Sequence, residues 1–149
     1  MNIGDLYIDM GGEIKEFEKF KGELGEGYEF TYKKRLAEVD IQFFGFVSGD
    51  FNPVHFDEQV ASNTSFKGRI AHGILTASFV SAALARLPGL IIILDIYLKY
   101  LIPVRIGDIV EVRGRVIEAD NHKKRYKVKF ISLVGEKRVI EGWANILSW

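Results

Sequence analysis

The residues whose types and spacing could support catalysis lie in one stretch, from Ser48 to Gly73. Asp50 is followed five positions later by His55, with an Asn-Pro pair between them. Because a residue before proline avoids the helical region, the chain must bend at this pair, and the bend allows the carboxylate and the imidazole to converge. A carboxylate and an imidazole that share one water molecule can act as a general acid–base pair, since histidine exchanges protons near neutral pH.

A second feature of this stretch is Gly73, at the expected start of a long apolar helix. The first backbone amides of a helix have no partner within it and lie at the positive end of its dipole. They can therefore stabilise an oxygen that becomes negative during a reaction, and a glycine lets a substrate approach the backbone closely. The sequence thus predicts an oxyanion site beside the pair of Asp50 and His55.

Each polar residue of this region also has a structural interpretation. Asp50 and Asn52 are common turn residues, and Asp57 can cap a short helix through its side-chain oxygen. For His72 we favour a structural role, as a hydrogen-bonded group that orients the loop. Ser81 can bond back to its own helical turn. Residue types and spacing alone leave catalytic and structural roles open.

The element that must position these groups is a helix from about Gly73 to Leu87. Its side chains are apolar or small nearly all round, and such a helix must be buried, so another element has to wrap it. Strands are expected at 28–36, 90–102, 108–119, 126–134 and 139–147, where apolar and polar residues alternate or β-branched residues cluster. A sheet wrapped round a single helix buries both. We expect an α+β hot-dog fold, with one domain over residues 1–149.

Shorter elements are expected on the N-terminal side of that helix. Residues 38–47 have helical spacing of apolar side chains and end before Gly49, which favours a short helix, and Asp57 is placed to cap a second one. Residues 1–16 form an extension of uncertain structure. Within it, the Gly11-Gly12 pair between two apolar segments predicts a small hairpin, since this pair suits a primed turn.

The strings around these residues resemble those of the MaoC-like dehydratases, a family that includes the (R)-specific enoyl-CoA hydratases. The motifs are S-G-D-F-N-P-V-H-F-D at 48–57, F-K-G-R-I-A-H-G-I-L-T-A-S at 66–78 and L-K-Y-L-I-P-V-R-I-G-D at 98–108. The resemblance spans about residues 17 to 147. It implies a hot-dog fold, a homodimer, and an enzyme that adds water to, or removes it from, an acyl thioester.

Carried over residue by residue, the resemblance makes Asp50 and His55 the catalytic dyad, with Asn52 supporting their turn. The Gly73 amide becomes the oxyanion donor to the thioester carbonyl, and Ser81 the hydroxyl group near the dyad. No metal and no organic cofactor is implied. Coenzyme A or an acyl carrier is the expected handle of the substrate.

One departure from the family is the strand that follows the helix. The family often has glycine and serine there, whereas this chain has the bulkier Leu90–Leu94. If these side chains line the acyl pocket, long acyl chains are excluded. The first 16 residues match nothing in the family pattern.

The composition excludes several other classes. Lysine plus arginine and aspartate plus glutamate each number 20, so the formal net charge is +0, and a nucleic-acid-binding or polybasic membrane-binding protein is not expected. The absence of cysteine removes disulfide scaffolds, thiolate metal sites and cysteine nucleophiles. The longest apolar run is far shorter than the ~18 residues that span a bilayer, and no signal peptide is evident. We expect a cytoplasmic protein.

Three further functions stay open at this point. They are acyl-thioester binding without catalysis, thioester hydrolysis on the same fold, and metal-dependent hydrolysis by Asp50, His55, Asp57 and His72, whose spacing matches no strong metal motif.

A single hot-dog sheet also leaves an exposed edge and a partly exposed helix end. Pairing two subunits edge to edge would cover both, so we expect a homodimer or a dimer of dimers, with the site near the interface.

Overall fold

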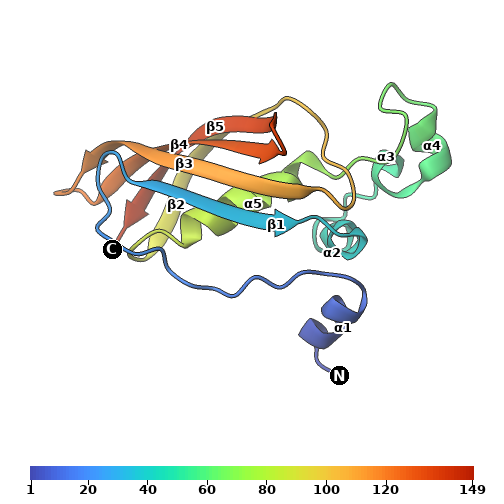
Figure 1. The fold of residues 1–149 in the computed structure, drawn as a ribbon, viewed down its shortest axis with the longest axis horizontal. Helices are drawn as coiled ribbons and strands as arrows, with labels where there is room; N and C mark the ends of the chain where they lie inside the picture. Colours follow the sequence, from blue (N-terminus) through green and yellow to red (C-terminus); the bar gives the residue numbers. More distant parts are fainter.

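A computed structural model describes all residues, 1–149, and its frame is one antiparallel sheet in the order β1-β3-β4-β5-β2 (Figure 1). The strands are β1 (Glu29–Arg35), β2 (Ile91–Tyr100), β3 (Ile109–Asp120), β4 (Arg125–Val134) and β5 (Lys137–Ser148). Side chains alternate between the two faces, so on β3 Val110 and Val112 are buried while Ile109 and Arg113 are exposed. The five predicted strands are confirmed.

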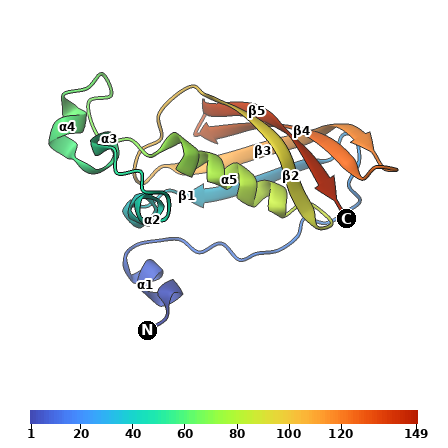
Figure 2. The same ribbon diagram turned by 180° about the vertical axis from the view of Figure 1, so that it is seen from behind.

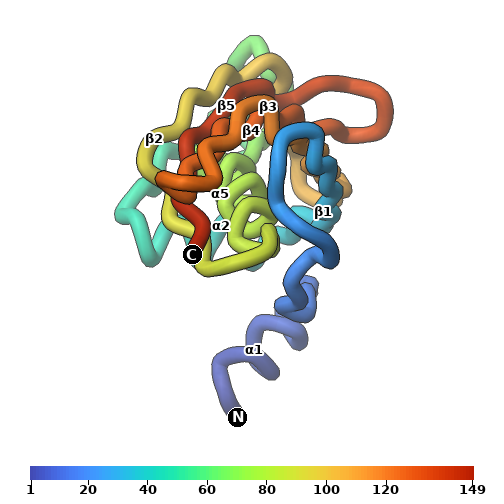
Figure 3. The backbone as a smooth tube through the Cα atoms, turned by 90° about the vertical axis from the view of Figure 1, so that its left-hand side faces the viewer, coloured from blue at the N-terminus to red at the C-terminus, as the bar shows by residue number.

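The long helix α5 (Gly73–Ala85) lies against one face of this sheet (Figure 2). Viewed along the molecule's long axis, the sheet arches over the helix (Figure 3). Val80 and Leu84 of the helix and Phe130 and Ile146 of the sheet are almost completely buried in a common core. Because each element can bury its apolar face only against the other, this packing holds the fold together. The predicted hot-dog architecture is confirmed.

The sheet does not enclose α5 on every side: the exposure expected at one end of the helix extends along one of its sides. Ile74, Ser78 and Ser81 follow one another at helical spacing and are exposed, Ile74 to 59%. The edge strand β2, which pairs only with β5, is also open. Its large apolar side chains Ile92, Leu94, Ile96 and Tyr97 are each about half exposed or somewhat less. Within one chain, the apolar surface of β2 and the open side of α5 have no cover.

Three short helices lie between β1 and α5: α2 (Glu38–Ser48), α3 (Pro53–Phe56) and α4 (Glu58–Ser62). Gly49 ends α2 in the left-handed conformation, with φ of 78°. Asp57 caps α4, because its side chain accepts a hydrogen bond from the backbone amide of Val60 at 3.0 Å. Both features agree with the sequence-based expectation.

The predicted N-terminal hairpin is wrong. Residues 3–9 form the helix α1 (Ile3–Asp9), and an unpaired extended segment follows it. The side chain of Asn2 caps the helix by accepting from the amide of Asp5 at 2.9 Å. Gly11, with φ of 89°, lies just after the end of the helix and does not turn a hairpin. We call residues 1–24 the N-terminal arm, and Figure 3 shows its helix standing away from the sheet.

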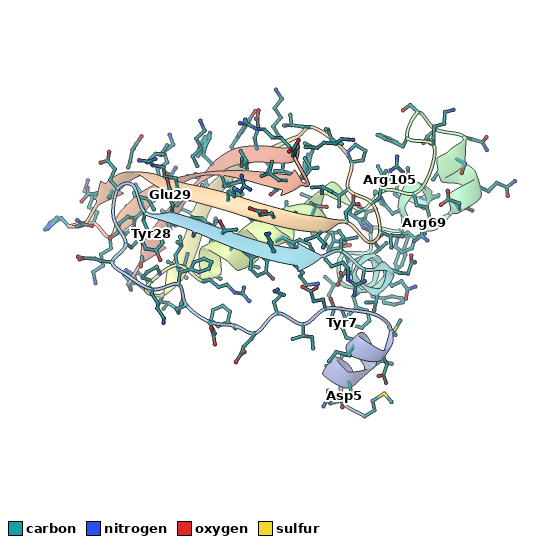
Figure 4. All side chains as sticks on the ribbon, viewed as in Figure 1. Asp5, Tyr7, Tyr28, Glu29, Arg69 and Arg105 are labelled. Carbon is teal, nitrogen blue, oxygen red and sulfur yellow. The ribbon has the colours of Figure 1, made fainter.

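Distant parts of the chain hold this arm in place. The Tyr7 hydroxyl donates to the Asp40 carboxylate and accepts a hydrogen bond from Lys34 Nζ at 2.8 Å. Figure 4 shows Tyr7 where α1 faces the rest of the molecule. At the other end of the arm, the buried Arg86 donates to the Glu16 carbonyl at 3.0 Å.

No helix of the chain has the length and apolar character needed to cross a membrane.

Candidate active site

The loop after α2 is shaped by hydrogen bonds between near neighbours. The Asp50 carboxylate accepts from the Asn52 amide at 3.1 Å, and the Asn52 side chain accepts from the Val54 amide at 3.4 Å. Proline at the first position of α3 fits the helix start, because its missing N–H has no partner there. These turns bring the side chains of Asp50 and His55 to the same place, as the sequence predicts.

His55 is held as a neutral base. Its side chain is largely buried, and ring Nδ1 lies 2.8 Å from the carbonyl oxygen of Ile70. Since a carbonyl can only accept, Nδ1 carries the proton and Nε2 keeps a free lone pair. Burial lowers the pKa of His55 below its ordinary value of 6.5, although the Ile70 carbonyl and Asp50 act in the opposite direction. The ring is therefore neutral at pH 7 and able to accept a proton.

His72 joins the same cluster from the residue before α5. It is 2% exposed, and its Nε2 donates to the backbone carbonyl of Asp50 at 2.9 Å. Its ring faces that of His55, with 3.9 Å between the ring centroids. The structural, loop-orienting role favoured for His72 agrees with these contacts.

The three side chains form a compact polar group. One carboxylate oxygen of Asp50 and one ring nitrogen each of His55 and His72 lie within 4.8 Å of one another. Two acceptors separated by this distance can both reach one water molecule, given hydrogen bonds of ~2.8 Å. The residue types are also those that ligate divalent metals. Asp57, the fourth residue of the metal hypothesis, is not in the group, because its side chain caps α4.

A cavity of about 430 Å³ opens beside this group. His55 and Gly73 both line it, and most of the remaining wall is apolar, including Ile70, Ile102 and Val104. A mostly apolar pocket with few polar groups suits the hydrocarbon part of a ligand, whose orientation the polar groups then fix.

Gly73 is the first residue of α5, and its amide donates no hydrogen bond within the chain. It is therefore a free donor at the positive end of a buried helix and at the wall of the cavity. A Cβ atom at this position would lie 2.8 Å from a ring carbon of Tyr100. Tyr100, which also lines the cavity, is a site residue that the sequence analysis did not single out. It lies within the 98–108 motif, which was the available signal.

Two arginines fasten the loop to its surroundings. Arg69 donates to the His55 carbonyl and to the Glu38 carboxylate, both at 2.8 Å. Arg105 donates to the carbonyl oxygens of Arg69 at 3.2 Å and of Phe66 at 2.5 Å. Figure 4 shows both arginines beside α3 and α4. Arg69 thus ties the loop both to a backbone carbonyl and to a carboxylate.

Two sequence-based assignments are not supported by the position of the residues in one chain. Ser81 lies eight residues beyond Gly73, about 12 Å along the helix axis, and on its exposed side rather than at the cavity. Leu90–Leu94 does not line the cavity either, since it belongs to the open edge of the sheet. The part of the cavity wall that follows α5 in the chain is instead formed by residues 100–104 and by Ile140.

Comparison with known proteins adds to this geometry. A family model described as MaoC like domain matches residues 19–137. An (R)-specific enoyl-CoA hydratase of Rhodospirillum rubrum is 41% identical over 127 residues, which cover 84% of this chain and 88% of that protein. A 3-hydroxybutyryl-CoA dehydratase of Methylorubrum extorquens is 39% identical over 126 residues, covering 83% and 80%. The crystal structure of protein af1124 from Archaeoglobus fulgidus matches with a TM-score of 0.96 at 50% identity, covering 99% of this chain and 93% of that one.

The extents of these matches differ at the N-terminus. The family model begins at residue 19, so most of the N-terminal arm lies outside it, whereas the match to af1124 includes nearly the whole chain. Residues 19–137 contain strands β1 to β4, α5 and the cluster of Asp50, His55 and His72, whereas nearly all of β5 lies beyond them. On these grounds the chain belongs to the MaoC-like domain family.

Proposed function

We propose that this protein adds water to 2-enoyl thioesters, giving (R)-3-hydroxyacyl thioesters, and catalyses the reverse dehydration. The observation that carries the proposal is the convergence of Asp50 on His55, which lines an apolar cavity whose wall also includes the free Gly73 amide. The names of the similar hydratase and dehydratase support the same reaction class and the stereochemical assignment.

The proposed mechanism needs one water molecule between the two side chains. His55 Nε2 accepts a proton from that water, while the Asp50 carboxylate accepts its second hydrogen bond and orients it. The water oxygen forms a bond to C3 of the enoyl group as the C2=C3 π bond breaks, and His55 delivers the proton to C2. Negative charge gathers meanwhile on the thioester oxygen, where the Gly73 amide stabilises it. Loss of one such donor typically costs ~10²–10³ in rate.

The chemistry divides the substrate into two parts. The acyl chain suits the apolar cavity, and the thioester handle, coenzyme A or an acyl carrier, extends from its mouth. Proton transfer and carbonyl polarisation are both supplied by the chain's own groups in this scheme, so we propose a reaction without metal or organic cofactor.

We also propose that the working form is a homodimer or a dimer of dimers. Pairing β2 with its copy would satisfy the free backbone groups of that edge and bury apolar side chains such as Ile96 and Tyr97. Sedimentation at micromolar concentration should then give at least twice the chain mass, and Ile96→Glu should lower it. A strictly monomeric wild type would contradict the assembly.

Location in the cytoplasm stays a prediction.

The proposed reaction is tested by incubating the purified protein with crotonyl-CoA and with longer 2-enoyl-CoA thioesters. Loss of enoyl absorbance and formation of the (R)-3-hydroxyacyl product are expected, with no release of free thiol. Thiol release would indicate hydrolysis instead, and binding without turnover at any chain length would indicate a non-catalytic acyl-binding protein. Activity that is lost with a chelator and restored by a divalent metal would indicate metal-dependent chemistry at Asp50, His55 and His72.

A further inference from the structure

His72 is a buried titratable residue that the proposed mechanism does not use. It does not line the cavity, yet it contacts both members of the dyad. Its Nε2 donates to the backbone carbonyl of Asp50, and its ring covers one face of the His55 ring. Phe44 of α2 and Phe56 of α3 pack round it, with centroid distances of 4.7 Å and 5.6 Å. One side chain thus joins two catalytic groups that come from different parts of the loop.

The hydrogen bonds of His72 fix its protonation. A carbonyl can only accept, so Nε2 carries a proton. Nδ1 is buried and has no hydrogen-bond partner in the chain. A second proton there would bury a charged donor without an acceptor, which is costly. His72 is therefore the neutral, Nε2-protonated tautomer, and the neighbouring His55 is the neutral, Nδ1-protonated one.

We propose that His72 is a positioning residue of the dyad: it holds the Asp50 backbone and the His55 ring in register so that both reach the same water. The inference rests on the proposed hydration, and it assigns to His72 no contact with the reacting atoms. Such a positioning role should have a measurable effect on the rate, because a misplacement of catalytic groups by about 1 Å can lower the rate ~10²-fold.

Two substitutions separate the two contacts. His72→Phe keeps an aromatic ring against His55 but removes the donor to Asp50, and His72→Gln offers an amide donor but removes the ring. Each should lower kcat by roughly 10- to 100-fold and leave KM nearly unchanged, since His72 does not line the cavity. Ser132→Ala is the matched control, because Ser132 Oγ is also buried without a partner but lies on β4. It should retain wild-type kcat.

A second measurement is independent of turnover. Nitrogen-15 NMR of the histidine rings should show His72 protonated at Nε2 and His55 at Nδ1 in the wild-type protein. In His72→Phe, if the role is positioning, the His55 signals should change while the circular dichroism spectrum stays that of the wild type.

The outcomes are distinguishable. Wild-type kcat in both folded His72 variants, or a His72 ring protonated at Nδ1, would overturn the positioning role without touching the proposed reaction. A wild-type protein that turns over no enoyl thioester would overturn the proposed reaction. The tautomers and the response of the His55 signals would then still decide whether His72 orders the cluster.

Discussion

Two regions place polar groups against the core: the active-site loop, residues 49–73, and the N-terminal arm, residues 1–24. They differ in how far apart in the sequence their hydrogen-bonded residues lie. In the loop, Asp50 contacts Asn52 two residues away, and His55 contacts Ile70 fifteen residues away. The arm is fixed by contacts such as the one between Glu16 and Arg86, 70 residues apart. Near-neighbour contacts therefore shape the turns of the loop, which Arg69 and Arg105 then fasten to the rest of the chain. The arm has only the contacts of the completed tertiary fold to hold it against the core.

The two regions also differ in what they leave unpaired. In the loop, His55 Nε2, His72 Nδ1 and the Gly73 amide have no hydrogen-bond partner in the chain. In the arm, the hydroxyl of Tyr7 both donates and accepts, and its partners Asp40 and Lys34 also pair with each other. Unpaired groups cost stability but are available to a substrate, whereas paired groups stabilise the fold. Changes in the loop should therefore lower activity, and changes in the arm should lower stability.

The largest stability effect is expected from Arg86→Met. Arg86 is 7% exposed, donates to Ala82 and Glu16 carbonyls, and lies over the Tyr32 ring. Its loss leaves acceptors without donors and removes a cation–π contact, at a cost of about 3 kcal/mol in the free energy of unfolding. Denaturant unfolding measures this cost. We also expect the variant to have the wild-type kcat at temperatures where it is folded. A large drop in kcat would contradict the proposed difference between the two regions.

The largest activity effect outside the dyad is expected from Arg69→Met. Arg69 holds the backbone of His55 and pairs with Glu38. Without it the imidazole is less well placed, so kcat should fall by about 10²-fold. The ion pair has an exposed carboxylate, so the free energy of unfolding should change little. Glu38→Gln is the control that weakens the ion pair but keeps the bond to His55, and it should retain most activity.

A smaller stability effect is expected from Tyr7→Phe in the arm. The variant loses the hydroxyl between Asp40 and Lys34 but keeps the ring against Phe43. Because Lys34 and Asp40 still pair directly, the cost should be about 1 kcal/mol. Thermal unfolding of the variant and the wild type would measure it, and an unchanged Tm would mean that the arm does not depend on this contact.

The two regions should also weaken at opposite ends of the pH scale. Burial lowers the pKa of His55, so the folded protein binds fewer protons than the unfolded chain as pH falls below 6.5, and stability is lost there. Burial and Asp40 raise the pKa of Tyr7 above its ordinary value of 10.0, so stability is lost as pH rises above that value. A plot of the free energy of unfolding against pH should be flatter than that of the wild type at the acid end for His55→Gln. For Tyr7→Phe it should be flatter at the alkaline end. Equal pH profiles for wild type and both variants would contradict these assignments.

The comparison of regions also explains what could be predicted from the sequence. The bend at Asn52-Pro53, the cap at Asp57 and the end of α2 at Gly49 follow from backbone preferences of single residues, so the loop was predictable. The strands were predictable because their alternation reports which face is buried.

The rest depended on distant contacts. The Gly11-Gly12 pair is compatible with a hairpin, whereas the contact between Tyr7 and the distant Asp40 favours the helix. Tyr100 became part of the site because β2 carries it to Gly73, a register that no local pattern encodes. The role of Ser81 stays a prediction: within one chain it lies on the exposed side of α5, and spacing along a helix does not reveal which side the sheet covers.

The most direct test of the central claim is the rate of crotonyl-CoA hydration by the wild type, Asp50→Asn and His55→Gln. Both variants keep the size of the side chain and remove its capacity to accept a proton or fully orient the water. If the two groups act on one water beside the Gly73 amide, each substitution should lower kcat by ~10²–10⁴-fold, with thermal unfolding little changed. Hydration at the wild-type rate by either folded variant would contradict the account.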